Sequence, residues 1–367
     1  MKVLNINLPD SNYDIVIEKG LLKNVGAEIK KVYNKTNIAI VTDSNVYKLY
    51  GLKMQDFLIK DNFTPNFIVV EPGEESKSLT TLEYVYSKLA EFNITRSDLI
   101  IAFGGGVVGD LAGFAASTYL RGINYIQVPT TLLAQIDSSV GGKVAVNLKE
   151  GKNLAGSFYH PLKVLIDPDM LLSLPEKYFK DGFGEVIKYA CIKDPILFSL
   201  LMSFNDNQLF NYIEQLIYTC CQIKKNLVEK DEKDKAQRML LNFGHTIGHA
   251  IEKHMNYEIS HGEAVSLGML FITKNSEHLG YTEKGTYEKI RNILERFNIN
   301  YNISIDTQDI MNYINMDKKN LSGEINLILL KKIGEAFIHR IPILETNKLL
   351  SIWMENLWTQ LKSRSQN

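Results

Sequence analysis

The stretch LLNFGHTIGHAIE places two histidines, His245 and His249, four residues apart, each directly after a glycine. On a helix this spacing puts both imidazoles on one face. His254 and His261 follow closely, so four of the seven histidines of the chain lie between residues 245 and 261. Imidazole nitrogens bind zinc, transfer protons or hydrogen-bond a substrate. The spacing alone leaves metal binding, catalysis and packing open.

A metal site would need a further ligand, and Glu185 is a candidate for it. Catalytic zinc takes about three protein ligands from His, Asp, Glu or Cys and keeps one position open. Cysteine is rare in this chain, which favours nitrogen and oxygen ligands. Glu185 lies in the apolar segment DGFGEVIKYA, where an unpaired carboxylate is unfavourable. Lys188 follows one helical turn later, so a Glu185–Lys188 ion pair, with histidines satisfied by hydrogen bonds, is the alternative.

Two polar residues precede the histidines at helical spacing. Arg238, Asn242, His245 and His249 are separated by 4, 3 and 4 residues, which predicts that they share one face of a single helix. This face carries a cation, an amide and two imidazoles where a packing helix would carry hydrocarbon. His261 lies at a further predicted helix start.

A glycine-rich turn indicates a second kind of site. AFGGGVVGDLAGF fits Gly-x-Gly-x-x-Gly at Gly104, Gly106 and Gly109, between a predicted strand and a predicted helix. Glycines there let the backbone approach a pyrophosphate, and the helix N-terminus favours its negative charge. The usual dinucleotide fingerprint adds an acidic residue about 20 positions later, but residues 111–136 contain none. A tight turn with close helix–sheet packing is the alternative.

A third polar set lies in QIDSSVGGKVAVNLKEGKNLAGSFYHP. Asp137, Lys143, Lys152 and Asn153 stand there among glycines and small residues. Lysines beside glycine-rich backbone suit a phosphate ester. A flexible surface loop with ordinary lysines is the alternative.

The elements that must position these residues alternate in the first half of the chain. Short apolar runs at 37–43, 66–77, 98–106 and 123–131 read as strands, and helical spacing between them is clearest at 79–89. This alternation predicts a mostly parallel sheet covered on both faces, with ligands at the carboxyl ends of the strands.

The second half reads as largely helical. Leu209 to Val228 follow the spacing of an amphipathic helix, and residues 263–278 and 282–297 continue the pattern. The strand-like runs there are INLILLKKIG and EAFIHRIP, and the charged run 224–238 is expected to be a solvated helix end and loop. The fold class is therefore a Rossmann-like α/β domain over residues 1–168 and a largely α-helical domain over 169–367.

Bulk properties exclude several classes of protein. The chain has 367 residues, and its 41 basic and 42 acidic residues give a formal charge of −1. This balance offers no electrostatic case for nucleic acid or an anionic membrane. Cys191, Cys220 and Cys221 do not make a disulfide framework, so a reducing cytoplasm is expected. The sequence contains no apolar run of about 18 residues, so no membrane span is predicted. Residues 1–20 are predicted to form two strands around a turn.

Six stretches, in order and over nearly the whole chain, resemble the 3-dehydroquinate synthase family: GGGVVGDLAGFAAS, RGINYIQVPTTLLAQIDSSVGGK, GKNLAGSFYHP, GEVIKYA, LLNFGHTIGHAIE and HGEAVSLGM. The resemblance implies a dehydroquinate synthase-like fold, with an NAD-binding N-terminal domain and a helical domain that binds metal and substrate. It also implies an active site in the cleft between them and a homodimer. Phe183-Gly184 and KNLAGSF depart slightly from the common family pattern, without removing a functional group.

The resemblance also implies roles for individual residues. One zinc or cobalt ion would be bound by Glu185, His245 and His261, while His249 would hydrogen-bond the substrate. Arg121, from the neighbouring subunit of a dimer, would lie near the phosphate, and Lys318 or Lys319 would reach the site. Further substrate contacts are expected from Asp137, Lys143, Asn153, Lys188, Lys224, Arg238 and Asn242. NAD contacts are expected from Asp43, Pro72, Gly73, Glu74, Glu75, Ser76, Lys77, Gly106, Val107, Val108, Gly109, Asp110, Thr130, Thr131, Lys143, Lys152, Met170, Leu171, Leu172 and Ser173.

The implied activity converts 3-deoxy-D-arabino-heptulosonate 7-phosphate to 3-dehydroquinate and phosphate, the second step of the shikimate pathway. It proceeds by transient oxidation with NAD, phosphate elimination, re-reduction, ring opening and aldol closure. Three rival functions remain: another sugar-phosphate cyclase, a metal-dependent polyol dehydrogenase, and a non-catalytic sensor of NAD and metal.

Overall fold

The computed structural model describes residues 1–204, 206–256, 258–300, 323–342 and 345–346. The chain forms two compact units. Unit 1 comprises Met1–Phe179 and Asn211–Lys233, and unit 2 comprises Lys180–Phe210 and the chain from Asp234 onward. None of the helices in the described part of the chain combines the length and the apolar character needed to span a bilayer.

Unit 1 is organised around a seven-stranded sheet in the order β1-β2-β9-β6-β5-β3-β4. All neighbouring pairs are parallel except β1 and β2, which form an antiparallel hairpin. The predicted mostly parallel sheet is therefore confirmed. Its elements are β1 (Lys2–Asn7), β2 (Asn12–Ile17), η1 (Leu21–Asn24), α1 (Val25–Lys30), β3 (Asn37–Asp43), α2 (Ser44–Val46), η2 (Tyr47–Gly51), α3 (Leu52–Lys60), β4 (Thr64–Val70), η3 (Glu74–Ser76), α4 (Leu79–Glu91), β5 (Leu99–Gly104), α5 (Gly106–Thr118), η4 (Tyr119–Arg121), β6 (Asn124–Pro129), η5 (Ala134–Ser138), β7 (Lys143–Leu148), β8 (Gly151–Phe158), β9 (Lys163–Ile166) and η6 (Pro168–Ser173).

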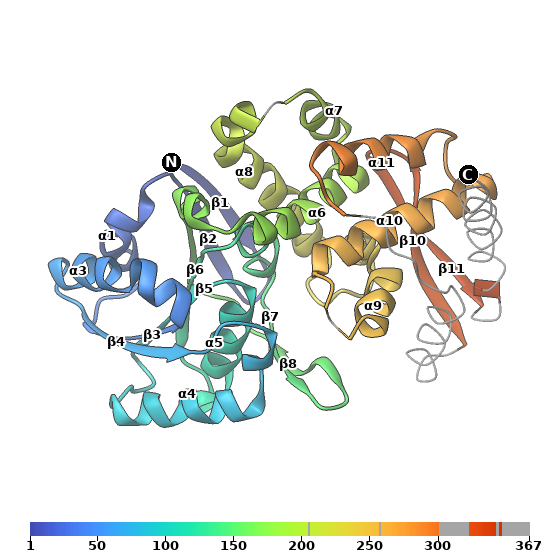
Figure 1. Cartoon of the computed structure of the whole chain (residues 1–367). Coiled ribbons are helices and arrows are strands. Elements are labelled where there is room, and N and C mark those ends of the chain that lie inside the picture. Colours follow the sequence, from blue (N-terminus) through green and yellow to red (C-terminus); the bar gives the residue numbers. More distant parts are fainter. Residues whose placement is uncertain (205, 257, 301–322, 343–344, 347–367) are drawn as a thin grey trace. The chain divides into compact units, whose positions relative to one another are not determined.

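Both faces of the sheet are covered, because alternate residues of each central strand point to opposite sides. Ile38 and Ile40 of β3 pack with α1 and α3, whereas Ala39 and Val41 pack with α4 and α5. Figure 1 shows α1 and α3 on one side of these strands and α4 and α5 on the other. Strands buried on both faces explain the continuous apolar runs of the sequence.

The segment with Lys143, Lys152 and Asn153 is ordered as the hairpin β7–β8, so the alternative of a flexible surface loop is wrong. β7 and β8 pair in an antiparallel register from Lys143↔Phe158 to Leu148↔Gly151. Val144 and Val146 of β7 are buried, and Val146 belongs to the hydrophobic cluster that also contains residues of α4 and α5. This apolar anchoring fixes the hairpin against the sheet domain.

Unit 2 is mainly helical, as predicted, and its late strand-like runs form the hairpin β10–β11. The single boundary expected between residues 168 and 169 does not separate the units, because η6 and the start of α6 group with unit 1 and most of α8 returns to it. The elements in the described part of this half are α6 (Glu176–Lys193), α7 (Pro195–Ser203), α8 (Asp206–Lys230), η7 (Gln237–Asn242), α9 (His245–His254), α10 (His261–His278), α11 (Thr286–Arg296), β10 (Glu324–Lys332) and β11 (Glu335–Pro342).

Helix α8 confirms the predicted amphipathic helix and shows why it belongs to unit 1. Its side chains bond to the first hairpin of the chain: Lys2 Nζ donates to Gln215 Oε1 at 2.7 Å, and the Asn7 amide donates to Glu229 Oε1 at 2.7 Å. Cys221 Sγ lies 3.2 Å from the carbonyl oxygen of Gln135. These contacts tie α8 to unit 1 along its length.

A buried ion pair in unit 1 makes stability depend on pH. Lys163 Nζ lies 2.8 Å from Glu28 Oε2, and both side chains are buried. Burial would raise the pKa of Glu28, but its bonds to Lys163 and Lys31 outweigh burial and lower the pKa from 4.5. A carboxyl group with a lowered pKa stabilises the fold above its unfolded pKa and loses this contribution as pH falls.

We therefore expect Glu28→Gln to lower the free energy of unfolding by about 2 kcal/mol at pH 7, the scale of a charge-assisted hydrogen bond. The difference from the wild type should begin to shrink as pH falls below 4.5, and it should be lost as pH falls through the lowered pKa of Glu28 in the folded protein. Urea unfolding between pH 3.5 and 7.5 measures this. Glu91→Gln, which breaks an exposed ion pair with Lys88, is the control and should have a much smaller effect. A deficit in Glu28→Gln that is independent of pH would contradict the assignment.

Candidate active site

The structure brings Glu185, His245 and His261 together from three helices of unit 2. His245 Nε2 lies 3.6 Å and His261 Nε2 3.7 Å from the same carboxylate oxygen, Glu185 Oε1. One ligand atom from each residue lies within 4.8 Å of the others. Donor atoms around a tetrahedral zinc ion are roughly 3.4 Å apart, given bonds of about 2.1 Å. Two imidazoles and one carboxylate at these separations are a donor set that fits a divalent metal ion.

Both imidazoles are oriented through their other ring nitrogen. His245 Nδ1 lies 3.2 Å from the carbonyl oxygen of Phe243, and His261 Nδ1 lies 3.4 Å from Glu252 Oε2. A proton on each Nδ1 satisfies these acceptors and leaves the Nε2 lone pair directed toward Glu185. Metal-binding histidines are characteristically held by such carbonyl or carboxylate partners. Sequence reasoning missed Glu252, whose helical position in α9 gives no local signal of this role.

The second oxygen of Glu185 forms an ion pair with Lys188. The ion-pair alternative and the metal alternative are thus not exclusive, because each carboxylate oxygen faces a different partner. Burial lowers the pKa of His245 well below its ordinary value, and the charge of Lys188 adds to this effect. Burial alone would lower the pKa of His261, but its bond to Glu252 and the charge of Glu185 outweigh burial and raise the pKa to about 9. His245 is therefore neutral at pH 7, and a metal ion would displace a proton from His261.

Glycines beside the three candidate ligands allow their helices to approach at backbone distance. A Cβ atom on Gly184 would lie 2.6 Å from the carbonyl oxygen of Gly262, and one on Gly262 would collide with the carbonyl oxygen of Asp181. The Gly262 amide also donates to Asp181 Oδ1 at 2.5 Å. Asp181 lies one turn before Glu185 on α6, so these contacts set the position of His261 relative to Glu185.

The predicted single helix through Arg238, Asn242, His245 and His249 is wrong. Arg238 and Asn242 belong to η7, and α9 begins only at His245. Gly244 separates them, with φ of 80°, and a Cβ atom there would lie 2.6 Å from the carbonyl oxygen of Val265. The break therefore results from the close packing of α9 on α10. His249, one turn after His245, is exposed, and its ring centroid lies 5.4 Å from that of His245.

The charged run 224–238 is not simply solvated, because Lys224 and Arg238 at its two ends are buried. Lys224 Nζ donates to the carbonyl oxygen of Asp137 at 2.6 Å and to Asp137 Oδ1 at 2.5 Å. Two residues predicted for substrate binding, Lys224 and Asp137, are thus in direct contact within unit 1. Lys188 and Arg238, in unit 2, are each about 1% exposed.

The carboxyl ends of β3 and β5 form the topological switch point of the sheet. The chain leaves β3 for β4 on one side and later continues from β5 to β6 on the other. Ligands of open parallel sheets bind outside the strand ends at such a point. Here the end of β5 is followed by Gly105, the N-cap of α5, and no acidic residue lies in the first turn of that helix. The positive helix N-terminus therefore faces the position expected for a pyrophosphate.

The glycines of this turn also serve packing, so the alternative reading of the motif holds as well. A Cβ atom on Gly104 would lie 2.7 Å from Val108, and one on Gly109 would lie 3.1 Å from Gln127 Oε1. Beside the turn, Lys77 Nζ bonds to Asp110 and to Asn153 Oδ1. Burial raises the pKa of Asp110, while the charge of Lys77 counteracts this. Three predicted contact residues are therefore joined in one network.

Other predicted residues lie at strand ends or on the surface. Asp43 Oδ1 caps α2 by accepting from the amides of Asn45 and Val46. Thr130 and Thr131 follow β6, and η6 carries the predicted residues 170–173, of which Met170 packs in the core and Leu172 is exposed. Arg121 is exposed in left-handed backbone with φ of 68°. Lys318 and Lys319 lie outside the described residues.

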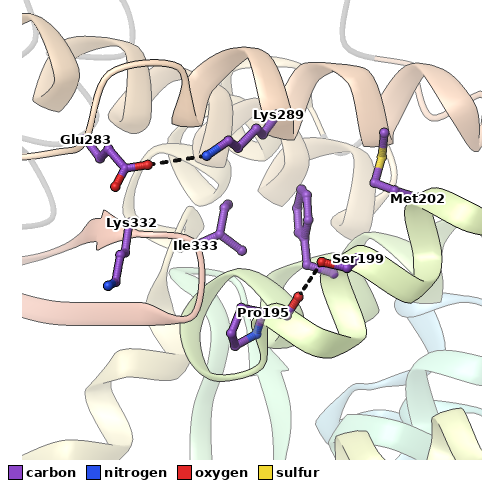
Figure 2. Close-up of a pocket in the computed structure, with 8 residues that line it drawn as sticks. Pro195, Ser199, Met202, Glu283, Lys289, Lys332 and Ile333 are labelled. Atoms are coloured by element: carbon purple, nitrogen blue, oxygen red, sulfur yellow. Dashed lines mark hydrogen bonds and ion pairs between the residues drawn. The ribbon is translucent and has the colours of Figure 1, made fainter.

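A cavity of about 450 Å³ in unit 2 involves none of the predicted site residues. Figure 2 shows Lys289 and Lys332 at this cavity, with Lys289 Nζ bonded to Glu283 Oε1 at 3.3 Å. Lys332 Nζ lies 3.9 Å from Glu335 Oε2. Both lysines therefore have a carboxylate partner. The cavity is lined by Pro195, Phe198, Ser199, Met202, Glu283, Lys289, Lys332 and Ile333.

Comparison with protein-family models decides the family. Residues 67–181 match the N-terminal and residues 182–320 the C-terminal model of 3-dehydroquinate synthase. The chain belongs to the 3-dehydroquinate synthase family. A 3-dehydroquinate synthase from Clostridium kluyveri is 53% identical over 348 residues, or 94% of this chain and 97% of the relative. The 3-dehydroquinate synthase of Clostridium perfringens strain 13 is 55% identical over 346 residues, or 94% of this chain and 99% of the relative.

Solved structures extend the likeness from the 3-dehydroquinate synthase family to other sugar-phosphate cyclases. The 2-epi-5-epi-valiolone synthase of Streptomyces hygroscopicus with bound NAD⁺ and Zn²⁺ has a TM-score of 0.86 and 27% identity, over 95% of this chain and 99% of that one. A 2-deoxy-scyllo-inosose synthase complexed with carbaglucose-6-phosphate, NAD⁺ and Co²⁺ has a TM-score of 0.84 and 25% identity, over 95% and 100%. An iron-containing alcohol dehydrogenase shares only the fold, with 14% identity and a TM-score of 0.63.

We expect Gly262→Ala to weaken metal binding, because the added methyl group pushes α10, and with it His261, away from Asp181 and Glu185. Loss of a contact that orients a metal ligand typically lowers metal affinity by about 10- to 100-fold. Zinc titration against a competing chelator measures the change. Gly113→Ala is the control, since its methyl group would collide with Val144 in unit 1. Both variants should lose stability, but equal losses of zinc affinity would argue against the proposed role of Gly262.

Proposed function

We propose that this chain catalyses the 3-dehydroquinate synthase reaction, converting 3-deoxy-D-arabino-heptulosonate 7-phosphate to 3-dehydroquinate and phosphate. Membership of the family supports the reaction class. The observation that carries the proposal is the convergence of Glu185 Oε1 with two oriented imidazole nitrogens, His245 Nε2 and His261 Nε2. This is a donor set with room for substrate hydroxyls in the remaining coordination positions.

We propose Glu185, His245 and His261 as the ligands of one divalent ion, zinc or cobalt. Solved cyclases of similar fold that contain Zn²⁺ or Co²⁺ together with NAD⁺ support this assignment. When bound, the ion supplies Lewis-acid polarisation of a substrate hydroxyl and NAD supplies reversible acceptance of a hydride. Glu252 and the carbonyl group of Phe243 would hold the two imidazoles with Nε2 available to the ion.

We propose that NAD binds at the switch point of the unit 1 sheet. The open N-terminus of α5 would receive the pyrophosphate. Further contacts would come from Asp43 at the end of β3, from residues 73–77 and from Thr130 and Thr131 after β6. Lys152 and residues 170–173 complete the proposed set.

The buried cations are proposed to bind the charged groups of the substrate. A substrate with a carboxylate and a phosphate needs fixed positive charge to be held in one orientation. Asp137 holds the ammonium group of Lys224, and Glu185 holds that of Lys188. Both ammonium groups therefore have a fixed position. Lys143, Arg238, Asn242, Asn153 and His249 are the further proposed contacts.

Two finer assignments rest on the family resemblance. We propose a homodimer in which Arg121 contributes to the phosphate site of the neighbouring subunit. We also propose a cytoplasmic location, which the three buried cysteine thiols support.

The rival functions are less well supported. A polyol dehydrogenase would need neither the lysines of the β7–β8 hairpin nor Lys224. The iron-containing alcohol dehydrogenase of similar fold is only 14% identical to this chain. The cyclases for other substrates share 25% and 27% identity, against 53% and 55% for the 3-dehydroquinate synthases.

Incubating purified protein with 3-deoxy-D-arabino-heptulosonate 7-phosphate, catalytic NAD and zinc or cobalt should release one phosphate per 3-dehydroquinate formed. NADH should not accumulate, because the hydride returns to the substrate. Phosphate assay, product identification by mass spectrometry and absorbance at the NADH band measure the three quantities. Stoichiometric NADH would instead indicate a dehydrogenase, and no turnover with bound metal and NAD would indicate another substrate or a sensor.

The two histidines of α9 should separate metal binding from turnover. His245→Ala should lose bound metal and activity. His249→Ala should retain the metal and slow turnover by about 10- to 100-fold, the effect of losing a hydrogen bond to a charged group worth about 1.5–3 kcal/mol. Metal content by mass spectrometry and steady-state rates measure both. His254→Ala, at the end of the same helix, is the control and should change neither. Full metal occupancy in His245→Ala would overturn the ligand assignment.

A further inference from the structure

Asn147, near the end of β7, connects two segments that are distant in sequence. Its amide donates to the carbonyl oxygen of Lys77 at 2.7 Å. Its side-chain Nδ2 donates to Glu74 Oε1 at 2.8 Å, and its Oδ1 accepts from the amide of Asn153 at 2.8 Å. One residue therefore bonds the segment 73–77, proposed to bind NAD, and the hairpin that carries Asn153, proposed to bind substrate.

The bond to Asn153 maintains an unfavourable backbone conformation. Asn153 has φ of 59°, in the left-handed region that non-glycine residues adopt at a cost in free energy. Its amide is held by Asn147, and its side-chain Oδ1 accepts from Lys77 Nζ. Lys77 is itself bonded to Asp110 in the first half of α5. The position of Asn153 thus depends on bonds that lead back to residues 74–77.

We propose that Asn147 is a positioning residue that couples NAD binding to the conformation of the β7–β8 hairpin. The proposal rests on the proposed function, since it takes residues 73–77 as part of the NAD site. A cofactor that fixes Glu74 also fixes Asn147, which bonds to the Asn153 amide. A cofactor that fixes Lys77 fixes the ammonium group that bonds to the Asn153 side chain. Substrate then meets an Asn153 whose position NAD has already fixed. By linkage, fixing Asn153 strengthens NAD binding by the same factor.

An amide side chain is required because it donates and accepts at once. Asn147→Ala removes both side-chain bonds. Asn147→Asp keeps an acceptor for the Asn153 amide, but it removes the donor and places a second carboxylate beside Glu74. The two variants therefore separate the bond to the hairpin from the bond to the segment 73–77.

The test combines NAD calorimetry with hydrogen–deuterium exchange on the zinc-loaded full chain. In the wild type, NAD should slow exchange at residues 106–110 and also in the hairpin, residues 151–158. In Asn147→Ala, NAD should bind about tenfold more weakly and protect residues 106–110 while leaving the hairpin unprotected. The KM for the sugar phosphate should rise by a larger factor than kcat falls. In Asn147→Asp, NAD affinity should fall, but KM should stay closer to that of the wild type.

Asn5 provides a matched control in the same unit. Its Nδ2 donates to a carboxylate oxygen, Asp14 Oδ1, at 2.7 Å on the exposed β1–β2 hairpin. Asn5→Ala removes a bond from an amide to a carboxylate, and Asn5→Asp places a second carboxylate beside the first, as the substitutions at Asn147 do beside Glu74. Both Asn5 variants should leave NAD affinity, hairpin exchange and KM unchanged. If Asn147→Ala does not fold, Glu74→Ala removes the same bond from its other end and should reduce hairpin protection by NAD.

Equal protection of the hairpin by NAD in the wild type and in Asn147→Ala, with Asn147→Ala folded, would overturn the proposal. Equal effects of the Asn5 and Asn147 substitutions would do so as well. Failure of the wild type to bind NAD would instead refute the proposed function. These outcomes are separate, because calorimetry and exchange do not depend on turnover.

Discussion

The candidate active site of unit 2 depends on the close approach of three helix backbones. Glu185, His245 and His261 each have a glycine as a direct neighbour in sequence: Gly184, Gly244 and Gly262. These glycines lie where a methyl group would meet a carbonyl group of another helix. The ligand atoms are therefore positioned by main-chain contacts, which leave little freedom, and not by the rotamers of long side chains. Gly248, which precedes His249, lies in a similar position, because a Cβ atom there would be 3.0 Å from the carbonyl oxygen of Ala264.

The same packing concentrates charge around one buried carboxylate. Glu185 is fully buried and faces Lys188 with one oxygen and two imidazoles with the other. A buried carboxylate is costly unless several partners compensate it. Two kinds of positive partner offset the cost of burying Glu185. The ammonium group of Lys188 is a permanent partner, whereas a proton on an imidazole can be exchanged for a metal ion.

Periodicity predicted the elements of unit 1 well, because strands buried on both faces leave continuous apolar runs in the sequence. It failed at Gly244, where the 4-3-4 spacing through Arg238 suggested one helix, and a tertiary contact with Val265 instead breaks it. Glu252 and Asn147 could not be found from local sequence, since their roles depend on partners that only folding brings near. The division at residue 168 failed for the same reason: α8 is helical like its neighbours, but its bonds are to β1 and β2.

The return of α8 to unit 1 has a consequence for how such chains can diverge. The two family models meet at residues 181 and 182, close to the first change of unit. A gene fusion at that point would combine the sheet of one parent with an α8 from the other. The Lys2–Gln215, Asn7–Glu229 and Lys224–Asp137 bonds would then join residues of different ancestry. Exchange of an intact unit by recombination needs two further crossovers, one on either side of residues 211–233, in addition to the one near residue 180.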